Sequence, residues 1–190
     1  MLSEAMRPVH AVFNEARVRI FLFKSRYLLV LACFIFLISA VKPAWFLLGF
    51  YVALFGELIQ VWSFACLEKN SNLSVRGPYM FSRNPMYIGR YFLLTGCLLT
   101  TGYIGWVPVL TVLYYFYAVN RVKREETRLH GLFGPDYENY CLNVNRFIPS
   151  FKAVEKDVLF FFKWTLLVKN HGHWNLMAML GCFALIYFST

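Results

Sequence analysis

The feature that most constrains the fold of this chain is a series of apolar runs separated by short basic segments. The runs cover 27–41, 44–66, 86–101 and 104–120, and a weaker pair covers 158–168 and 174–189. A membrane helix needs about 20 residues to cross ~30 Å of hydrocarbon, and only 44–66 reaches that length comfortably. The others must recruit flanking residues or thin the bilayer locally. The pattern predicts an all-α fold, a polytopic membrane helix bundle of about five transmembrane helices.

The composition also favours a membrane environment. Hydrophobic residues make up 59% of the chain and charged residues 15%, whereas soluble domains average roughly 45–50% and about 25%. The net charge of +9 lies in short clusters between apolar runs, so we expect no nucleic-acid partner. The five cysteines have no paired spacing, and His171 and His173 have no cysteine or carboxylate near them in sequence. We therefore expect no metal site.

The distribution of lysine and arginine predicts the orientation of the helices. If the N-terminus is cytoplasmic, the segments 1–26, 67–85 and 121–157 lie on the same side. Lys42 is then the only one of 19 basic residues clearly on the far side, with Lys169 undecided. This bias is the positive-inside pattern. We therefore predict a single, multi-pass integral membrane domain, 1–190, with a cytoplasmic N-terminus.

Two parts of the bundle have a more specific expected form. Thr100-Thr101-Gly102 is a short uncharged break, so 86–120 is predicted to form a helical hairpin. The N-terminal segment contains an expected amphipathic surface helix at 9–24. The tail 158–189 is interrupted at 169–173, which allows either a surface helix plus one short span or a re-entrant pair.

The first polar segment ends in a clear helix start. Gly77-Pro78 is a turn pattern, and Asn84-Pro85 combines a favoured N-cap residue with a proline at the first helical position. The free N–H groups of such a helix can bind an anion such as a carboxylate. The alternative is a well-capped membrane helix without a ligand.

The second polar segment follows the fourth apolar run. If that helix continues past the membrane, Arg121, Glu125 and Arg128 share one face, because their spacing is i, i+4 and i+7. Gly134-Pro135 then ends the helix. The alternative interpretation is an ordinary surface salt bridge.

A carboxylate inside an apolar run is a third candidate. Glu57 and Gln60 lie in the run 44–66. A charged group inside the bilayer costs a few kcal/mol and needs a partner or a wet cavity. Arg83, Lys69 or the substrate are the candidate partners.

Together these segments resemble the isoprenylcysteine carboxyl methyltransferase family and its relatives, the small membrane phospholipid methyltransferases. The resemblance covers 56–149 and leaves out the extension 152–190. It consists of Gly56-Glu57 with Trp62, Gly77-Pro78-Tyr79, the Arg-x-Pro-x-Tyr stretch at 83–87, Glu125-Glu126 with Leu129, Phe133-Gly134 with Tyr137 and Tyr140, and Arg146 with Pro149.

The resemblance implies an enzyme that uses S-adenosylmethionine, releases S-adenosylhomocysteine and methylates a lipid-like substrate at the cytoplasmic membrane face. It implies a cytoplasmic cofactor pocket roofed by the C-terminal segment. The cofactor residues would be Ser71, Asn72, Leu73, Ser74, Tyr79, Asn84, Pro85, Met86, Tyr87 and Glu125. Arg121 would orient the substrate, with Glu57 and Arg83 as further substrate-binding candidates, and Arg121 and Glu125 would be the catalytic pair. The family's usual Arg-His-Pro is Arg83-Asn84-Pro85 here, and an asparagine cannot shuttle a proton.

Two other functions remain open. Membrane sterol reductases share a related C-terminal region but bind NADPH; the acidic pair Glu125-Glu126 favours the methyltransferase, while the nearby cations Arg121, Lys123 and Arg124 would suit a phosphate-rich cofactor. A non-catalytic membrane scaffold or transporter subunit is the second alternative. The methyl acceptor, which could offer a carboxyl, amine or thiol group, and the oligomeric state are not determined by the sequence.

Overall fold

The computed structural model describes residues 15–69, 72–151 and 156–189, and every regular element in these ranges is helical. The elements are α3 (Ala16–Lys24), α4 (Arg26–Ala40), α5 (Pro43–Cys66), the 3₁₀ helix η1 (Gly77–Met80), α6 (Pro85–Leu99), the 3₁₀ helix η2 (Ile104–Trp106), α7 (Val107–Phe133), α8 (Pro135–Asn143), α9 (Lys156–Leu159), α10 (Trp164–Lys169) and α11 (Gly172–Phe188). The predicted all-α class is confirmed. Of the predicted N-terminal helix, 9–14 lies outside the described residues.

The helices follow the apolar runs closely, but their lengths differ. Among the described residues, α5 is the one helix that is both long and apolar enough to cross a membrane, and Tyr27–Ala40 of α4 is a shorter apolar stretch. Helices of 15 residues such as α4 and α6 rise only about 22 Å, less than the ~30 Å of a bilayer core. The predicted count of five spans therefore stays a prediction.

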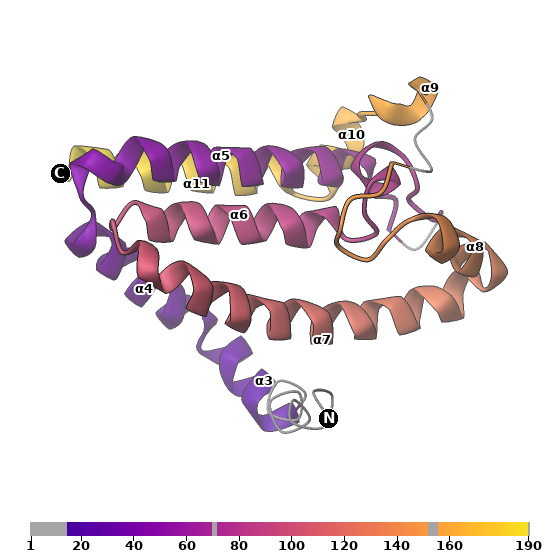
Figure 1. Cartoon of the computed structure of the whole chain (residues 1–190), viewed down its shortest axis with the longest axis horizontal. Coiled ribbons are helices and arrows are strands. Elements are labelled where there is room, and N and C mark those ends of the chain that lie inside the picture. The colour runs from indigo at the N-terminus through magenta and orange to yellow at the C-terminus, as the bar shows by residue number, and fades with distance from the viewer. Residues whose placement is uncertain (1–14, 70–71, 152–155, 190) are drawn as a thin grey trace.

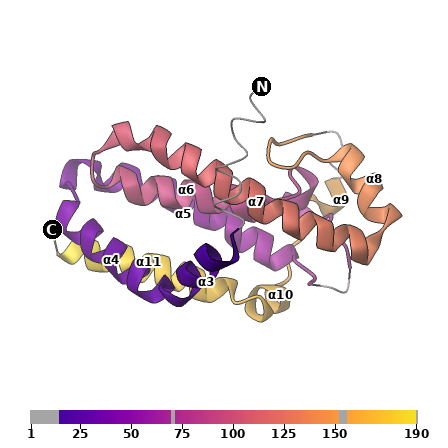
Figure 2. The same ribbon diagram turned by 90° about the horizontal axis from the view of Figure 1, so that it is seen from below.

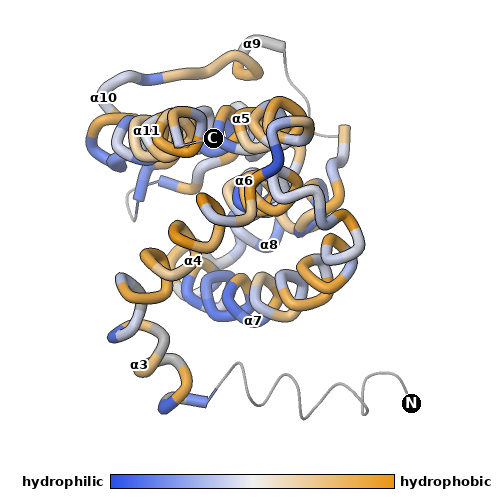
Figure 3. Tube along the Cα trace, turned by 90° about the vertical axis from the view of Figure 1, so that its left-hand side faces the viewer, coloured by the Kyte–Doolittle hydropathy of each residue, from blue (hydrophilic) through white to orange (hydrophobic). Residues whose placement is uncertain are grey.

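Figure 1 shows α5, α6 and α7 running lengthwise beside one another, with α11 behind α5. Figure 1 shows α4 and α3 running obliquely away from α5 and α11, so α4 overlaps α11 only in the view from below (Figure 2). Hydrophobic residues colour most of α4, α5 and α11, whereas α7 carries a long hydrophilic stretch (Figure 3). The apolar helices and the polar half of α7 therefore separate in space.

Among the described helices, α5 and α6 make the most extensive contact. Gly49 and Gly56 on α5 face Gly96 and Gly89 on α6, so the two helices run antiparallel with their backbones touching. A Cβ atom added at Gly89 would lie 2.5 Å from the Gly56 carbonyl oxygen. Small residues at such positions allow membrane helices to approach closely enough for dispersion contacts along their length.

The predicted hairpin of α6 and α7 is also present. The hydroxyls of Thr100 and Thr101 donate to carbonyls of the preceding turn at 2.7 Å, and Gly102 adopts a φ of 72° that reverses the chain. Across the hairpin, the Tyr114 hydroxyl donates to the Tyr87 carbonyl at 2.7 Å. This bond fixes the start of α6 against the middle of α7.

The tail returns along α5. His171 takes a left-handed conformation, with a φ of 62°, between α10 and α11. Met179 and Phe183 of α11 then pack on Ala53 of α5. The tail is therefore a short helix followed by a longer one, and α11 is part of the bundle.

The glycine contact yields a stability prediction. Gly89→Ala should destabilise the protein by about 1–3 kcal/mol, because the new methyl group meets backbone rather than a movable side chain. The matched control is Gly181→Ala on α11, where an added Cβ meets nothing within 4 Å; it should be neutral or stabilising by up to ~1 kcal/mol. Thermal unfolding in detergent measures both. Equal effects of the two changes would contradict the close packing.

Candidate functional site

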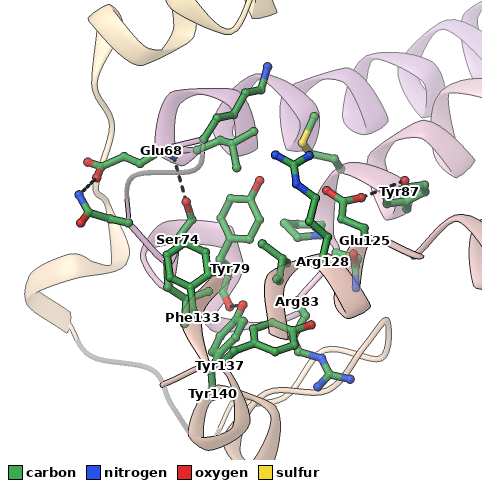
Figure 4. A pocket seen from close by; sticks show the side chains of 18 residues that line it. Glu68, Ser74, Tyr79, Arg83, Tyr87, Glu125, Arg128, Phe133, Tyr137 and Tyr140 are labelled. Carbon is green, nitrogen blue, oxygen red and sulfur yellow. Dashed lines mark hydrogen bonds between the residues drawn. The ribbon is translucent and has the colours of Figure 1, made fainter. Parts of the chain in front are cut away.

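A cavity of about 260 Å³ lies where α5 ends, α6 begins and the polar half of α7 passes (Figure 4). It is bordered by residues from both predicted polar segments and from α8. Its lining consists of Leu67, Glu68, Lys69, Asn72, Leu73, Ser74, Tyr79, Arg83, Asn84, Pro85, Met86, Tyr87, Glu125, Arg128, Leu129, Phe133, Tyr137 and Tyr140. The two segments, distant in sequence, therefore meet at one small-molecule-sized space.

The start of α6 supplies one wall. The helix begins at Pro85 as predicted, but the Asn84 side chain does not cap it. Its Nδ2 instead donates to the Arg146 carbonyl at 3.2 Å. Pro85 and Met86 from the first turn of the helix line the cavity. The asparagine that replaces the family's usual histidine thus ties the helix start to the 145–150 segment.

The polar half of α7 supplies the opposite wall. This helix continues unbroken to Phe133 and ends at Gly134, as the sequence predicts. Glu125 Oε2 accepts a hydrogen bond from the Tyr87 hydroxyl at 3.3 Å. Arg121, one turn earlier, is exposed and close enough to Tyr87 to interact with its hydroxyl, but it does not line the cavity. Glu125 therefore faces the cavity and Arg121 lies outside it.

Tyr79, Tyr137 and Tyr140 are three of the aromatic residues that line the cavity. Tyr140 donates from its hydroxyl to the Tyr79 carbonyl at 2.7 Å and lies near Tyr137. Burial raises the pKa of all three phenols above the ordinary tyrosine value. They therefore stay protonated and neutral at physiological pH, and can offer hydroxyl donors and ring faces but no negative charge.

Glu126 has a different role from its neighbour Glu125. Its carboxylate accepts from Arg146 Nε at 3.0 Å and from Arg146 Nη2, and pairs with Arg83 Nη2 at 3.1 Å. The hydrogen bonds to this carboxylate raise the pKa of Arg146. Arg83 is also held by its backbone N–H, which donates to the Asn145 carbonyl at 2.9 Å. Glu126 thus joins α7 to the α6 entrance and the 145–150 segment.

The predicted site residues divide into three groups. Asn72, Leu73, Ser74, Tyr79, Arg83, Asn84, Pro85, Met86, Tyr87 and Glu125 line the cavity. Arg121 and Glu57 do not line it. Ser71 lies outside the described residues.

The buried Glu57 has a partner that the sequence did not suggest. Its Oε2 accepts a hydrogen bond from Gln60 Nε2 at 3.1 Å, within the same helix. Of the two cations considered for it, Arg83 pairs with Glu126 and Lys69 lines the cavity.

Several lining residues were not among the predicted site residues. Glu68 and Lys69 follow the end of α5 directly, and Arg128 lies on the Glu125 face of α7. Their positions in the sequence were the available clue. Glu68 and Lys69 are polar residues that follow an apolar run, and Arg128 shares a helix face with the candidate Glu125. Glu68 is held by two hydrogen bonds, since its backbone N–H donates to Ser74 Oγ at 3.0 Å and its Oε2 accepts from Asn72 Nδ2 at 2.6 Å.

The predicted cofactor, S-adenosylmethionine, carries an ammonium, a carboxylate, a sulfonium and an adenosine group, and the lining offers a candidate partner for each of the three charged groups. Glu125 offers an anion, the α6 start offers a helix N-terminus, and the neutral tyrosines offer ring faces. Arg83 Nε is buried beside the cavity and makes no hydrogen bond within the described part of the chain. A hydrogen-bond acceptor on a bound ligand would satisfy that N–H donor.

Comparison with known protein families identifies the family of this chain. Residues 27–136, more than half of the chain, match the model of the phospholipid methyltransferase family. The chain belongs to that family. This confirms the predicted resemblance to the small membrane methyltransferases and indicates a methyltransferase that acts on lipids at a membrane. No curated protein and no solved structure matches the chain significantly.

The family match and the site overlap incompletely. The match begins before α5, at residue 27, and ends at residue 136. Tyr137 and Tyr140 of α8 line the cavity from beyond it, and Arg146, the partner of Glu126, also lies beyond it. In this member of the phospholipid methyltransferase family, residues that follow the matched region therefore also border the cavity.

The Glu126 contacts yield a second prediction. Glu126→Gln should destabilise the protein by about 2 kcal/mol, because Arg83 and Arg146 lose a charged acceptor and Arg83 is largely buried. The control is Glu138→Gln: that carboxylate pairs with His130 at 2.7 Å on the exposed surface and should contribute less than about 0.5 kcal/mol. Thermal unfolding of both variants in detergent provides the comparison. A Glu126→Gln protein as stable as the control would show that the 145–150 segment is held by other contacts.

Proposed function

We propose that this protein transfers a methyl group from S-adenosylmethionine to a membrane lipid at the cytoplasmic face of the bilayer. The observation that carries the proposal is the meeting of the α6 start and Glu125 at one cavity in a phospholipid methyltransferase family member. In Figure 1, α5 and α6 extend to one side of the point where α5 ends and α6 begins, and α8 lies on the other side. A soluble donor and a membrane-bound acceptor both have access to such a position.

The three charged groups of the cofactor each have a candidate partner. Glu125 would bind its ammonium group, because a carboxylate and an ammonium form a charge-assisted hydrogen bond. The N-terminal turn of α6 would receive its carboxylate. Tyr79 or Tyr87 would place a ring face near the sulfonium. The bound cofactor would supply a methyl group carried on positively charged sulfur.

The catalytic contribution of the protein is positioning and exclusion of water. A lone pair of the acceptor forms the new bond to the methyl carbon while the sulfur retains the electrons of the broken bond. An amine acceptor must therefore be neutral when it reacts, and it releases one proton to water or a nearby base. A phospholipid amine fits the family best; a carboxylate, as in an isoprenylcysteine, and a thiol are the other acceptors that this chemistry allows.

Arg121 and Glu57 are suited to the acceptor rather than to the cofactor. Arg121 lies beside Tyr87, one helical turn before Glu125 on α7, where its guanidinium would pair with a lipid phosphate or carboxylate in bidentate fashion. Glu57 is 1% exposed within α5, and its Oε1 makes no hydrogen bond to the described residues. We infer that Glu57 orients the acceptor's polar group from within the bundle. Arg83 would add its buried Nε donor.

Ligand binding separates this function from the reductase alternative. The purified protein should bind S-adenosylhomocysteine saturably and should not bind NADPH, as measured by calorimetry in detergent. Glu125→Gln should weaken this binding by at least about tenfold, whereas Glu138→Gln should not. Arg121→Ala should abolish turnover while keeping the cofactor affinity, with Lys123→Ala as the matched exposed control. Saturable NADPH binding, or native turnover by both site variants, would overturn the assignment.

The acceptor is identified by its products. Cells that express the protein should contain a lipid species heavier by one methylene than in cells without it, and labelled methyl groups from S-adenosylmethionine should appear in that species. Mass spectrometry of extracted lipids detects both. Cells that express Arg121→Ala at the native level provide the control. Unchanged lipids and no label transfer would favour a non-catalytic membrane protein.

A further inference from the structure

The last turn of α5 is closed by a segment far away in the sequence. Asn170 Nδ2 donates to the carbonyls of Phe64 and Leu67 at 3.0 and 2.8 Å. The backbone N–H of Lys163 donates to the Ala65 carbonyl at 3.1 Å. The final carbonyls of a helix have no partner within the helix and need one from elsewhere. Here the segment 161–170 supplies donors to three of them.

The same segment also receives donors from α5. The Phe161 carbonyl accepts from Trp62 Nε1 at 3.2 Å and from Cys66 Sγ at 3.0 Å. Asn170 is 6% exposed, so its two bonds are shielded from water. A buried donor that satisfies two acceptors fixes their position strongly, because losing it would leave carbonyls unpaired in a dry environment.

The chain that leaves this turn forms one side of the cavity. Residues 67–69 and 72–74 line it, and we call these residues the cavity wall. A second cavity, of about 340 Å³, lies on the other side of this wall and is bordered by Phe161 and Lys163. Lys163 Nζ lies 3.7 Å from Glu68 Oε1. The segment 161–170 therefore holds both the helix end that precedes the cavity wall and the side chain of Glu68 within it.

We propose that Asn170 is a positioning residue for the cofactor site, and that the C-terminal segment 161–170, which lies outside the family match, is part of the cofactor-binding machinery. The segment acts through the end of α5: its donors fix the carbonyls at 64–67, and this sets the place of the cavity wall. The inference rests on the proposed use of S-adenosylmethionine, but the order of the cavity wall can be measured without any ligand.

The test compares variants that weaken contacts at the end of α5, close to the cavity wall, with a variant that weakens a contact of α5 far from it. Asn170→Leu keeps a similar side-chain size and removes both donors; Trp62→Phe keeps an aromatic ring and removes the bond to Phe161. Met179→Ala is the control, because it removes buried contacts between α11 and α5 at Ala53, away from the cavity. All three should unfold at lower temperature than the native protein. Stability alone therefore cannot distinguish the cavity wall from the rest of the bundle.

Cofactor affinity and local exchange make that distinction. Asn170→Leu should raise the Kd for S-adenosylhomocysteine and the KM for S-adenosylmethionine about tenfold, with kcat at saturating cofactor near the native value. Trp62→Phe should shift both constants in the same direction by a smaller factor. Met179→Ala should leave them unchanged. In ligand-free protein, amide hydrogen exchange at 67–69 and 72–74 should be faster in Asn170→Leu than in Met179→Ala.

Each outcome bears on one of the two proposals. If Asn170→Leu binds S-adenosylhomocysteine with native affinity and shows native exchange at the cavity wall, the positioning role of Asn170 is wrong and the proposed function stands. If the native protein fails to bind S-adenosylhomocysteine, the proposed function is wrong. In that case, faster exchange at the cavity wall in Asn170→Leu alone would still support the structural link between the tail and the cavity.

Discussion

The backbone contact between α5 and α6 sets the geometry on which the site depends. Glycines at 49 and 56 face glycines at 96 and 89, so the two helices cannot slide or separate without losing contact along their whole length. Because they run antiparallel, the end of α5 and the start of α6 are held side by side. The cavity is bordered by the residues that follow the first and begin the second. Dispersion packing in the apolar bundle therefore fixes the position of polar groups outside it.

Polar contacts complete what this packing begins. The start of α6 is tied to the 145–150 segment through Asn84, Arg83 and Glu126, and the end of α5 is tied to the tail through Asn170. In each of these two ties, one partner lies beyond the family match at 27–136. It is Arg146 at the start of α6 and Asn170 at the end of α5. The bundle helices thus bring the two sides of the cavity together, and the later segments hold each side in place. A small cavity at the end of a helix bundle needs both the helix packing and these polar contacts, because helix ends carry unpaired backbone groups.

The local features of this structure could be read from the sequence, and the long-range ones could not. Apolar runs predicted the helices, Asn84-Pro85 predicted the start of α6, and Gly134 predicted the end of α7, because each depends on neighbouring residues only. Glu125 and Glu126 look equivalent in sequence, yet neighbours on a helix point about 100° apart. One faces the cavity and the other binds Arg146. Glu68 and Asn170 have no sequence pattern that indicates their partners, which lie across the fold.

Glu125 and Arg121 differ in their relation to the cavity, because Glu125 lines it and Arg121 does not. One helical turn separates them on α7, and Tyr87 lies beside both, donating to Glu125 and interacting with Arg121. A carboxylate has two oxygens and accepts several hydrogen bonds, so Glu125 can pair with a ligand in the cavity while it keeps its bond to the Tyr87 hydroxyl. In the proposed function, this one phenol would therefore lie between the group that binds the cofactor and the group that binds the acceptor.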